Sequence, residues 1–204
     1  MNKLHKEVLN KFAISLVVAL VGMVVGDIAL SPLTAILIGF LSIPLVLIGV
    51  FVDKLRESLT YVYIIIFLLG MSIYPIINLY VSEIGAAWVV GSLLITILLF
   101  GGLATYAYLS KRDFGFLGTF LTIALLALIG VSIISLFINS TLLTLILAYA
   151  GVMIFSGYVL YDVSQIKNSN FSKEEVPWMV LKLFLDFINL FLDILRIIAS
   201  LVKD

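Results

Sequence analysis

Two aspartates lie within or beside long apolar stretches that otherwise carry almost no charge. Asp162 lies near the end of one such stretch and Asp186 lies inside the next, and the segment 167–177 turns the chain around between them. This turn brings both residues to similar depths on neighbouring helices. A carboxylate inside a membrane-spanning helix costs roughly 2.5–3.5 kcal/mol, so such residues usually face protein or water. We therefore expect Asp162 and Asp186 to lie close together.

A pair of neighbouring carboxylates responds to pH. Two unit charges about 4 Å apart repel by ~4 kcal/mol at an effective dielectric constant of about 20. Such a pair shares one proton at mildly acidic pH and loses it as the pH rises. The doubly ionised pair presents only oxygen ligands, which suit a hard cation such as Ca²⁺. The sequence therefore predicts that Asp162 and Asp186 form a pH sensor and part of a Ca²⁺ site.

Two structural alternatives stay open for these aspartates. Lys182 precedes Asp186 by one helical turn and could neutralise it along the same helix. Asp162 could instead be an ordinary helix-end residue at the level of the lipid headgroups.

The last apolar segment also carries a polar stripe. Asn189, Asp193 and Arg196 follow Asp186 at spacings that place all four side chains on one face of a helix. A stripe of this kind cannot face lipid, so it must face the interior of a bundle or a water-filled path. We expect this helix to lie at the centre of the fold, and we expect Asp193 and Arg196 to pair with each other.

The composition indicates an integral membrane protein. Of 204 residues, 63% are hydrophobic and 12% are charged, and the mean hydropathy is +1.27. Soluble domains carry about twice that share of charge. The formal net charge of zero gives no sign of nucleic-acid binding. The chain has no cysteine, and its one histidine, His5, stands apart from any cluster of ligands. We therefore expect no enzymatic activity and no cofactor.

The charged residues divide the chain into seven apolar spans. The uncharged stretch from Phe114 to Tyr161 would be about 72 Å long as one helix, against a hydrocarbon core of ~30 Å. It must therefore fold back, and the polar cluster 138–141 is the place for the turn. Gly22 and Gly26, spaced as in GxxxG, predict a close helix contact. The prediction is one all-α transmembrane domain over residues 1–204, with spans near 12–28, 33–52, 60–81, 85–109, 114–137, 141–163 and 178–201.

The basic residues predict the orientation of these spans. With the N-terminus in the cytoplasm, the outer loops hold no lysine or arginine and only Lys203 lies at the far terminus. This bias follows the positive-inside rule and places the C-terminus outside. The inner segments would hold Lys3, Lys6, Lys11, Lys54, Arg56, Lys111, Arg112, Lys167 and Lys173.

Several short motifs resemble those of one membrane-protein family. They are Tyr161-Asp162 with Gln165-Ile166-Lys167, the run Leu185-Asp186-Phe187-Ile188-Asn189-Leu190-Phe191, the loop Lys111-Arg112-Asp113-Phe114-Gly115-Phe116-Leu117-Gly118, and Tyr74-Pro75-Ile76. Together with the chain length and span count, they resemble the transmembrane BAX inhibitor motif family, in particular its bacterial seven-helix members. The resemblance covers nearly the whole chain, and the C-terminal motif is the most specific part.

The resemblance implies a fold and a function. It implies six helices packed around a central seventh helix in a prokaryotic cell membrane, and a pH-dependent leak of Ca²⁺, with Ca²⁺ and protons as the partners besides the lipid bilayer. Asp162 and Asp186 align with the family's pH-sensing pair. In bacterial relatives a basic residue at the inner end of the second span latches onto this pair, and Lys54 or Arg56 is the candidate here.

Other functions compete with the channel. A proton-coupled cation transporter also uses carboxylates within the membrane. An intramembrane aspartyl protease of the presenilin type is disfavoured, because Asp186 follows bulky Phe184 and Leu185 where that type has glycines. A regulator that acts through helix contacts without conducting ions is a third alternative.

Overall fold

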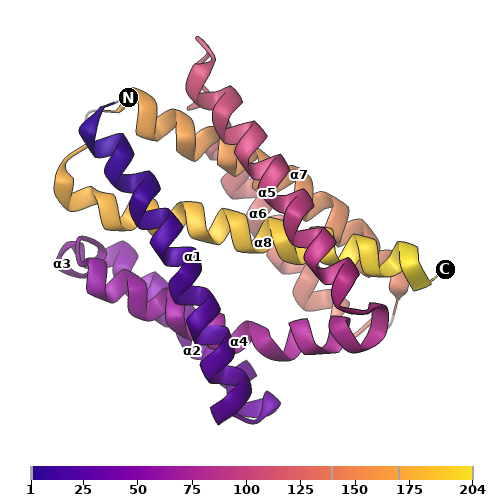
Figure 1. The fold of residues 1–204 in the computed structure, drawn as a ribbon. Helices are drawn as coiled ribbons and strands as arrows, with labels where there is room; N and C mark the ends of the chain where they lie inside the picture. The colour runs from indigo at the N-terminus through magenta and orange to yellow at the C-terminus, as the bar shows by residue number, and fades with distance from the viewer. Residues whose placement is uncertain (1, 139, 170, 204) are drawn as a thin grey trace. The chain divides into compact units, whose positions relative to one another are not determined.

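The chain folds almost entirely into helices in the computed structural model, which describes residues 2–138, 140–169 and 171–203. No β-strand occurs within these residues, so the all-α fold class is confirmed. In chain order the helices are α1 (Lys3–Ala29), α2 (Pro32–Phe51), α3 (Asp53–Arg56), α4 (Leu59–Ile84), α5 (Ala86–Leu109), α6 (Leu117–Ser135), α7 (Thr141–Asn168), the 3-10 helix η1 (Lys173–Glu175) and α8 (Val176–Lys203) (Figure 1).

The long uncharged stretch does turn back on itself. Helix α6 ends at Ser135 and α7 begins at Thr141, inside the segment where the reversal was predicted. Ser140 caps α7, because its hydroxyl oxygen accepts a hydrogen bond of 3.2 Å from the Leu143 amide. Asn139, which belongs to the predicted polar cluster, lies outside the described residues. Two helices therefore occupy a stretch that could not be one span.

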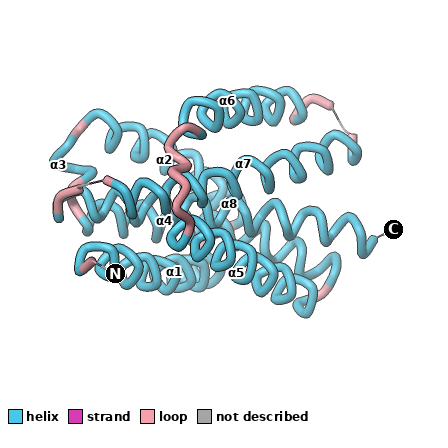
Figure 2. The backbone as a smooth tube through the Cα atoms, turned by 90° about the horizontal axis from the view of Figure 1, so that it is seen from above, coloured by secondary structure: helices cyan, strands magenta, loops and turns pink. Residues whose placement is uncertain are grey.

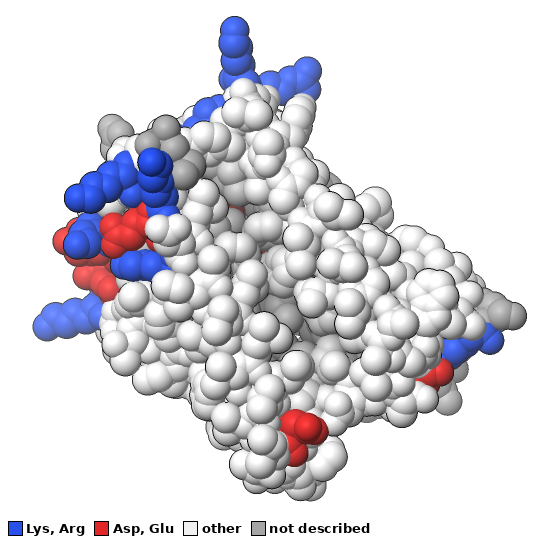
Figure 3. Space-filling view, in the orientation of Figure 1, with Lys and Arg blue, Asp and Glu red and all other residues white. Residues whose placement is uncertain are grey.

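Six helices are long and apolar enough to cross a membrane: α1, α2, α4, α5, α6 and α7. They leave large apolar side chains exposed, among them Phe40, Leu98 and Met153. The face shown in Figure 3 is largely free of charge, and its lysines, arginines and acidic residues are gathered in a few places. A surface of this kind needs lipid around it. The chain is therefore an all-α membrane protein.

Helix α8 differs from these six helices. It has 28 residues but carries Lys182, Asp186, Asp193 and Arg196, and it is not among the six apolar helices. No residue from Val176 to Ser200 is exposed. The count of seven spans and the packing of six helices around a central seventh stay predictions.

The described chain forms two compact units. Unit 1 comprises the residues within 1–79 and 170–184, and unit 2 comprises those within 80–169 and 185–204. Helices α4 and α8 each contribute to both units. Unit 1 thus contains α1 to α3, and unit 2 contains α5 to α7.

Glycines bring α1 and α4 into backbone contact within unit 1. A Cβ atom at Gly22 would collide with the carbonyl oxygen of Phe67, and one at Gly26 would lie 2.7 Å from the carbonyl oxygen of Met71. On α4, a Cβ atom at Gly70 would collide with the carbonyl oxygen of Ala19. The close contact predicted for Gly22 and Gly26 is therefore present.

Within unit 2, α7 packs against both α5 and α6, and Figure 2 shows α6 beside α7. Gly118 of α6 lies against Tyr161 of α7, because a Cβ atom at Gly118 would be 2.8 Å from the Tyr161 ring. The rings of Phe100 on α5 and Phe187 on α8 meet edge to face at 5.5 Å. These contacts position the stretches of α7 and α8 that carry the aspartates.

Candidate functional site

Three aspartates of unit 2 are buried, one on the apolar helix α7 and two on α8. Asp162 of α7 is 6% exposed, and Asp186 and Asp193 of α8 are 5% and 8% exposed. Aspartate is almost never buried to this degree unless other groups compensate its charge. These residues are therefore the candidates for chemistry in the chain.

The charges of Asp162 and Asp186 both interact with the same neighbouring side chain, that of Tyr158. The hydroxyl group of Tyr158, one turn before Asp162 on α7, is within electrostatic range of both carboxylates. Both aspartates make further interactions in the structure. The two residues are thus placed in one buried region of unit 2, while their direct pairing, the pH sensor and the Ca²⁺ site stay predictions.

Asp193 is held by two groups. Its Oδ1 atom accepts a hydrogen bond from Arg196 Nη1 at 2.9 Å, so the ion pair expected on one face of the helix is present. Its carboxylate also lies against α7 at Gly151, where a Cβ atom would collide with Oδ2 and come within 2.7 Å of Cγ. Gly151 therefore makes room for the Asp193 carboxylate.

Asn189 lies between these acidic residues on α8. Its Nδ2 atom donates a hydrogen bond of 2.7 Å to the carbonyl oxygen of Leu185 one turn earlier. The amide is thereby tied to its own helix. Whether Asn189, Asp193 and Arg196 line an ion path stays a prediction.

The loop between α5 and α6 makes a second polar cluster, which the sequence did not reveal as a unit. Asp113 Oδ1 accepts hydrogen bonds from the Gly115 amide at 2.9 Å and from Ser164 Oγ at 3.0 Å. The Ser164 hydroxyl group in turn accepts from the Phe114 amide at 3.0 Å. The only signal for this cluster in the sequence was the loop motif itself, because Asp113 and Ser164 are far apart along the chain.

The candidate latch residues lie in unit 1. Arg56 Nη2 forms an ion pair of 3.1 Å with Asp53 within the short helix α3, and Lys54 belongs to the same helix. The carboxylates they would latch onto, Asp162 and Asp186, lie in unit 2. The latch stays a prediction.

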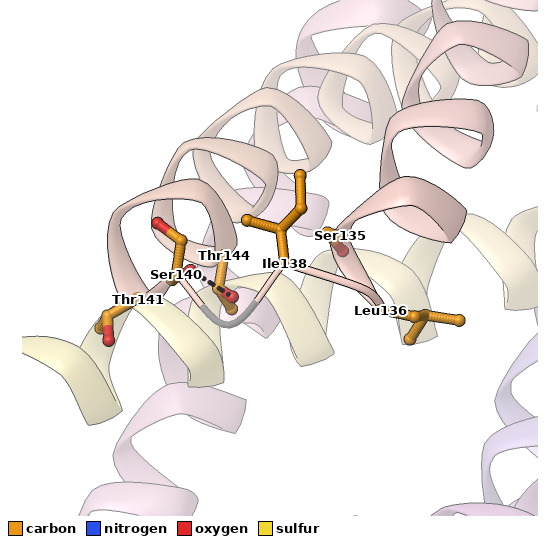
Figure 4. Close-up of a pocket in the computed structure, with 6 residues that line it drawn as sticks. All are labelled: Ser135, Leu136, Ile138, Ser140, Thr141 and Thr144. Atoms are coloured by element: carbon orange, nitrogen blue, oxygen red, sulfur yellow. Dashed lines mark hydrogen bonds between the residues drawn. The ribbon is translucent and has the colours of Figure 1, made fainter.

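A pocket of about 380 Å³ lies at the connection of α6 and α7 (Figure 4). There the Thr144 hydroxyl group donates to the carbonyl oxygen of Ser140 at 3.1 Å. Thr144 and Asp162 are about 27 Å apart along α7 at ~1.5 Å per residue, so this pocket is separate from the aspartates. Its lining consists of Ser135, Leu136, Ile138, Ser140, Thr141 and Thr144.

Among the described residues, no three or more His, Cys, Asp or Glu side chains are grouped so that they could hold a metal ion. Two carboxylates are a small part of the 6–8 oxygen ligands that Ca²⁺ takes. A Ca²⁺ ion at Asp162 and Asp186 would therefore keep much of its water, as suits a transported ion better than a resident one.

Comparison with known proteins gives similarity along nearly the whole chain. Residues 1–202 match the family model described as "Inhibitor of apoptosis-promoting Bax1". A membrane protein of Vibrio cholerae is 29% identical over 97% of this chain and 89% of its own length. Inner membrane protein YbhL of Escherichia coli K12 is 28% identical over 90% of this chain and 75% of its own length. Bax inhibitor 1 of Schizosaccharomyces pombe is 32% identical over 86% of this chain and 65% of its own length.

Proposed function

This chain belongs to the Bax inhibitor family of membrane proteins, and we propose that it is a pH-sensitive calcium leak channel of a prokaryotic cell membrane. The observation that supports the proposal is the burial of Asp162 and Asp186 in unit 2, where both carboxylates interact electrostatically with Tyr158. Buried carboxylates on apolar helices mark ion paths and proton relays in membrane proteins.

In the proposed mechanism, protonation of the aspartate pair controls the binding of Ca²⁺ in the path. At mildly acidic pH the two carboxylates share a proton, so the pair carries one negative charge. As the pH rises the proton leaves, and the pair becomes a doubly negative oxygen site that attracts a divalent cation. The affinity of the path for Ca²⁺ therefore changes with pH without any other titrating group.

The test is calcium flux into liposomes that contain the purified protein. Wild type is expected to pass Ca²⁺ with a rate that changes between about pH 6 and pH 8. Asp162→Asn and Asp186→Asn each remove one titrating carboxylate, so either variant is expected to lose most of that pH response. Asp27→Asn is the matched control, because Asp27 is an exposed aspartate of unit 1 whose carboxylate accepts a hydrogen bond from Asn78.

Three results would contradict the channel. Absence of flux at every pH would do so, and so would a pH response that both variants retain. Saturable uptake that requires an imposed proton gradient would instead indicate a proton-coupled cation transporter.

The topology is part of the proposal: seven spans that include α8, the N-terminus in the cytoplasm and the C-terminus outside. The chain lacks cysteine, so single cysteines can be introduced without removing native ones. Lys6→Cys and Lys111→Cys are expected to react only with a membrane-permeant maleimide in intact cells, and Lys203→Cys also with an impermeant one. Labelling of Lys6→Cys and Lys203→Cys from the same side would exclude an odd number of spans.

A further inference from the structure

We infer that Asp113 is a positioning residue for Asp162, because the loop between α5 and α6 is hydrogen-bonded to the end of α7 that carries this carboxylate. We call the cluster formed by Asp113, Phe114, Gly115, Ser164 and Asn168 the α5–α6 clasp. The inference rests on the proposed function, since it concerns the control of the same sensor. All of its residues belong to unit 2.

Hydrogen bonds converge on Ser164 in the α5–α6 clasp. The Ser164 side chain donates to Asp113 Oδ1 at 3.0 Å and accepts from the Phe114 amide at 3.0 Å and from Asn168 Nδ2 at 3.1 Å. Ser164 is completely buried. Because its one proton goes to Asp113, the hydroxyl oxygen is free to accept from both nitrogen donors, so the three contacts are mutually consistent.

A third residue of α7 fixes the start of the same loop. The Lys167 ammonium group donates to the carbonyl oxygen of Ser110. The Ser110 hydroxyl oxygen accepts a hydrogen bond of 3.1 Å from the Arg112 amide, which fixes the turn that leads to Asp113. Both ends of the loop are thus attached to α7.

Apolar packing supports these hydrogen bonds. Phe114 is 7% exposed, and its ring meets that of Tyr106 on α5 at 5.8 Å. A Cβ atom at Gly115 would lie 3.2 Å from Gln165 Nε2, so the loop backbone runs close to α7. In the first turn of α6, a Cβ atom at Gly118 would lie 2.8 Å from the ring of Tyr161, the residue before Asp162. The loop and the start of α6 together therefore contact α7 both before and after Asp162.

The position of Ser164 relative to Asp162 explains how the contact would act. Two residues along an α-helix correspond to a rotation of roughly 200°. The α5–α6 clasp therefore holds the face of α7 that points away from Asp162. It fixes the depth and rotation of the helix, and with them the position of the face that carries Asp162 and Tyr158.

The ionisation of Asp113 does not change in the range where the sensor works. The Gly115 amide, followed by Ser164, Asn168 and the positive charge of Lys167, holds the pKa of Asp113 below its ordinary value. A lowered carboxylate pKa means that the interaction is present above the unfolded-state pKa and is lost only in strong acid. Asp113 therefore stays ionised across this range. The titratable groups that interact electrostatically with Tyr158 beside the sensor are Asp162 and Tyr161 on α7 and Asp186 on α8.

The experiment measures the protonation of Asp162 without relying on conduction. The infrared band of its protonated carboxyl group is identified by its loss in Asp162→Asn and is then titrated in wild type, Asp113→Ala and Ser164→Ala. We expect both variants to move the midpoint by about half a pH unit or more, roughly a threefold change in proton binding. Asp113→Asn keeps an acceptor oxygen, so a smaller shift is expected, and Asp27→Asn, on the exposed surface of unit 1, should leave the midpoint unchanged.

Two further readouts separate the inference from its alternatives. Hydrogen exchange should become faster at the Gly115 amide in Asp113→Ala and at the Phe114 amide in Ser164→Ala, because each variant removes the acceptor of that amide. Faster exchange with an unchanged Asp162 midpoint would overturn the inference and leave the α5–α6 clasp a purely structural contact. If wild type titrates at Asp162 but passes no Ca²⁺, the channel fails while a shifted midpoint still supports the positioning role.

Discussion

Replacing Gly70 with alanine is expected to destabilise the protein by about 3 kcal/mol, at the upper end of the cost of overpacking. The new Cβ atom would collide with the carbonyl oxygen of Ala19 and lie 2.9 Å from its carbonyl carbon and its Cα atom. These are backbone atoms of α1, so no side-chain rotation can relieve the contact. The two helices would have to move apart, and the reciprocal contact between Gly22 and Phe67 would open with them.

Thermal unfolding in detergent checks this prediction. Gly91→Ala is the matched control, because a Cβ atom on Gly91 of α5 has nothing within 4 Å. That variant should be as stable as wild type or slightly more so, since alanine favours helices over glycine. Equal stability of Gly70→Ala and Gly91→Ala would show that α1 and α4 do not approach as closely as described.

Replacing Gly151 with alanine is the second change with a large expected effect, about 2 kcal/mol of destabilisation. The added methyl group would occupy the space of the Asp193 carboxylate. The carboxylate would then leave its position beside α7 and lose the geometry of its hydrogen bond to Arg196. A displaced, buried charge costs more than a displaced apolar group.

A double variant separates this contact from a general defect in α7. Asp193→Ala removes the atoms that collide, so adding Gly151→Ala to Asp193→Ala should cost little further stability. The two changes are therefore expected to be strongly non-additive in a thermal-unfolding cycle. Gly130→Ala on α6, where a Cβ atom meets open space, is the control. Additive effects would contradict the contact between Gly151 and Asp193.

The helices of this protein could be predicted from its sequence because charge and hydropathy divide the chain so clearly. The reversal between α6 and α7 followed from length alone, since the uncharged stretch is too long for one span. The predicted bounds are those of membrane spans, and the helices that contain them are longer: α1 begins at Lys3, ahead of the span predicted near 12–28. A helix can continue through the charged residues that flank its apolar part, and hydropathy alone shows only where the apolar part ends.

The candidate site could be predicted only in part. Burial of Asp162, Asp186 and Asp193 follows from their place in apolar helices, and the pairing of Asp193 with Arg196 follows from helical spacing. The partner of Asp113 could not be found in this way, because Ser164 is a common residue on a different helix. Nor does helical periodicity show that Gly151 provides the space for a carboxylate, since that depends on how α7 and α8 pack.

The charge and burial of α8 also bear on how the protein is made. Each Asp, Lys or Arg near the middle of a helix adds roughly 2.5–3.5 kcal/mol to its transfer from the translocon into lipid, whereas each Leu, Ile, Phe or Val returns only about 0.3–0.6 kcal/mol. With Lys182, Asp186, Asp193 and Arg196, α8 gains far less from lipid than the helices before it. It is also synthesised after α7, in which Gly151 leaves the space that the Asp193 carboxylate occupies. The insertion of α8 is therefore expected to depend on the earlier helices, because contacts with them replace the contacts with lipid that its charged residues disfavour.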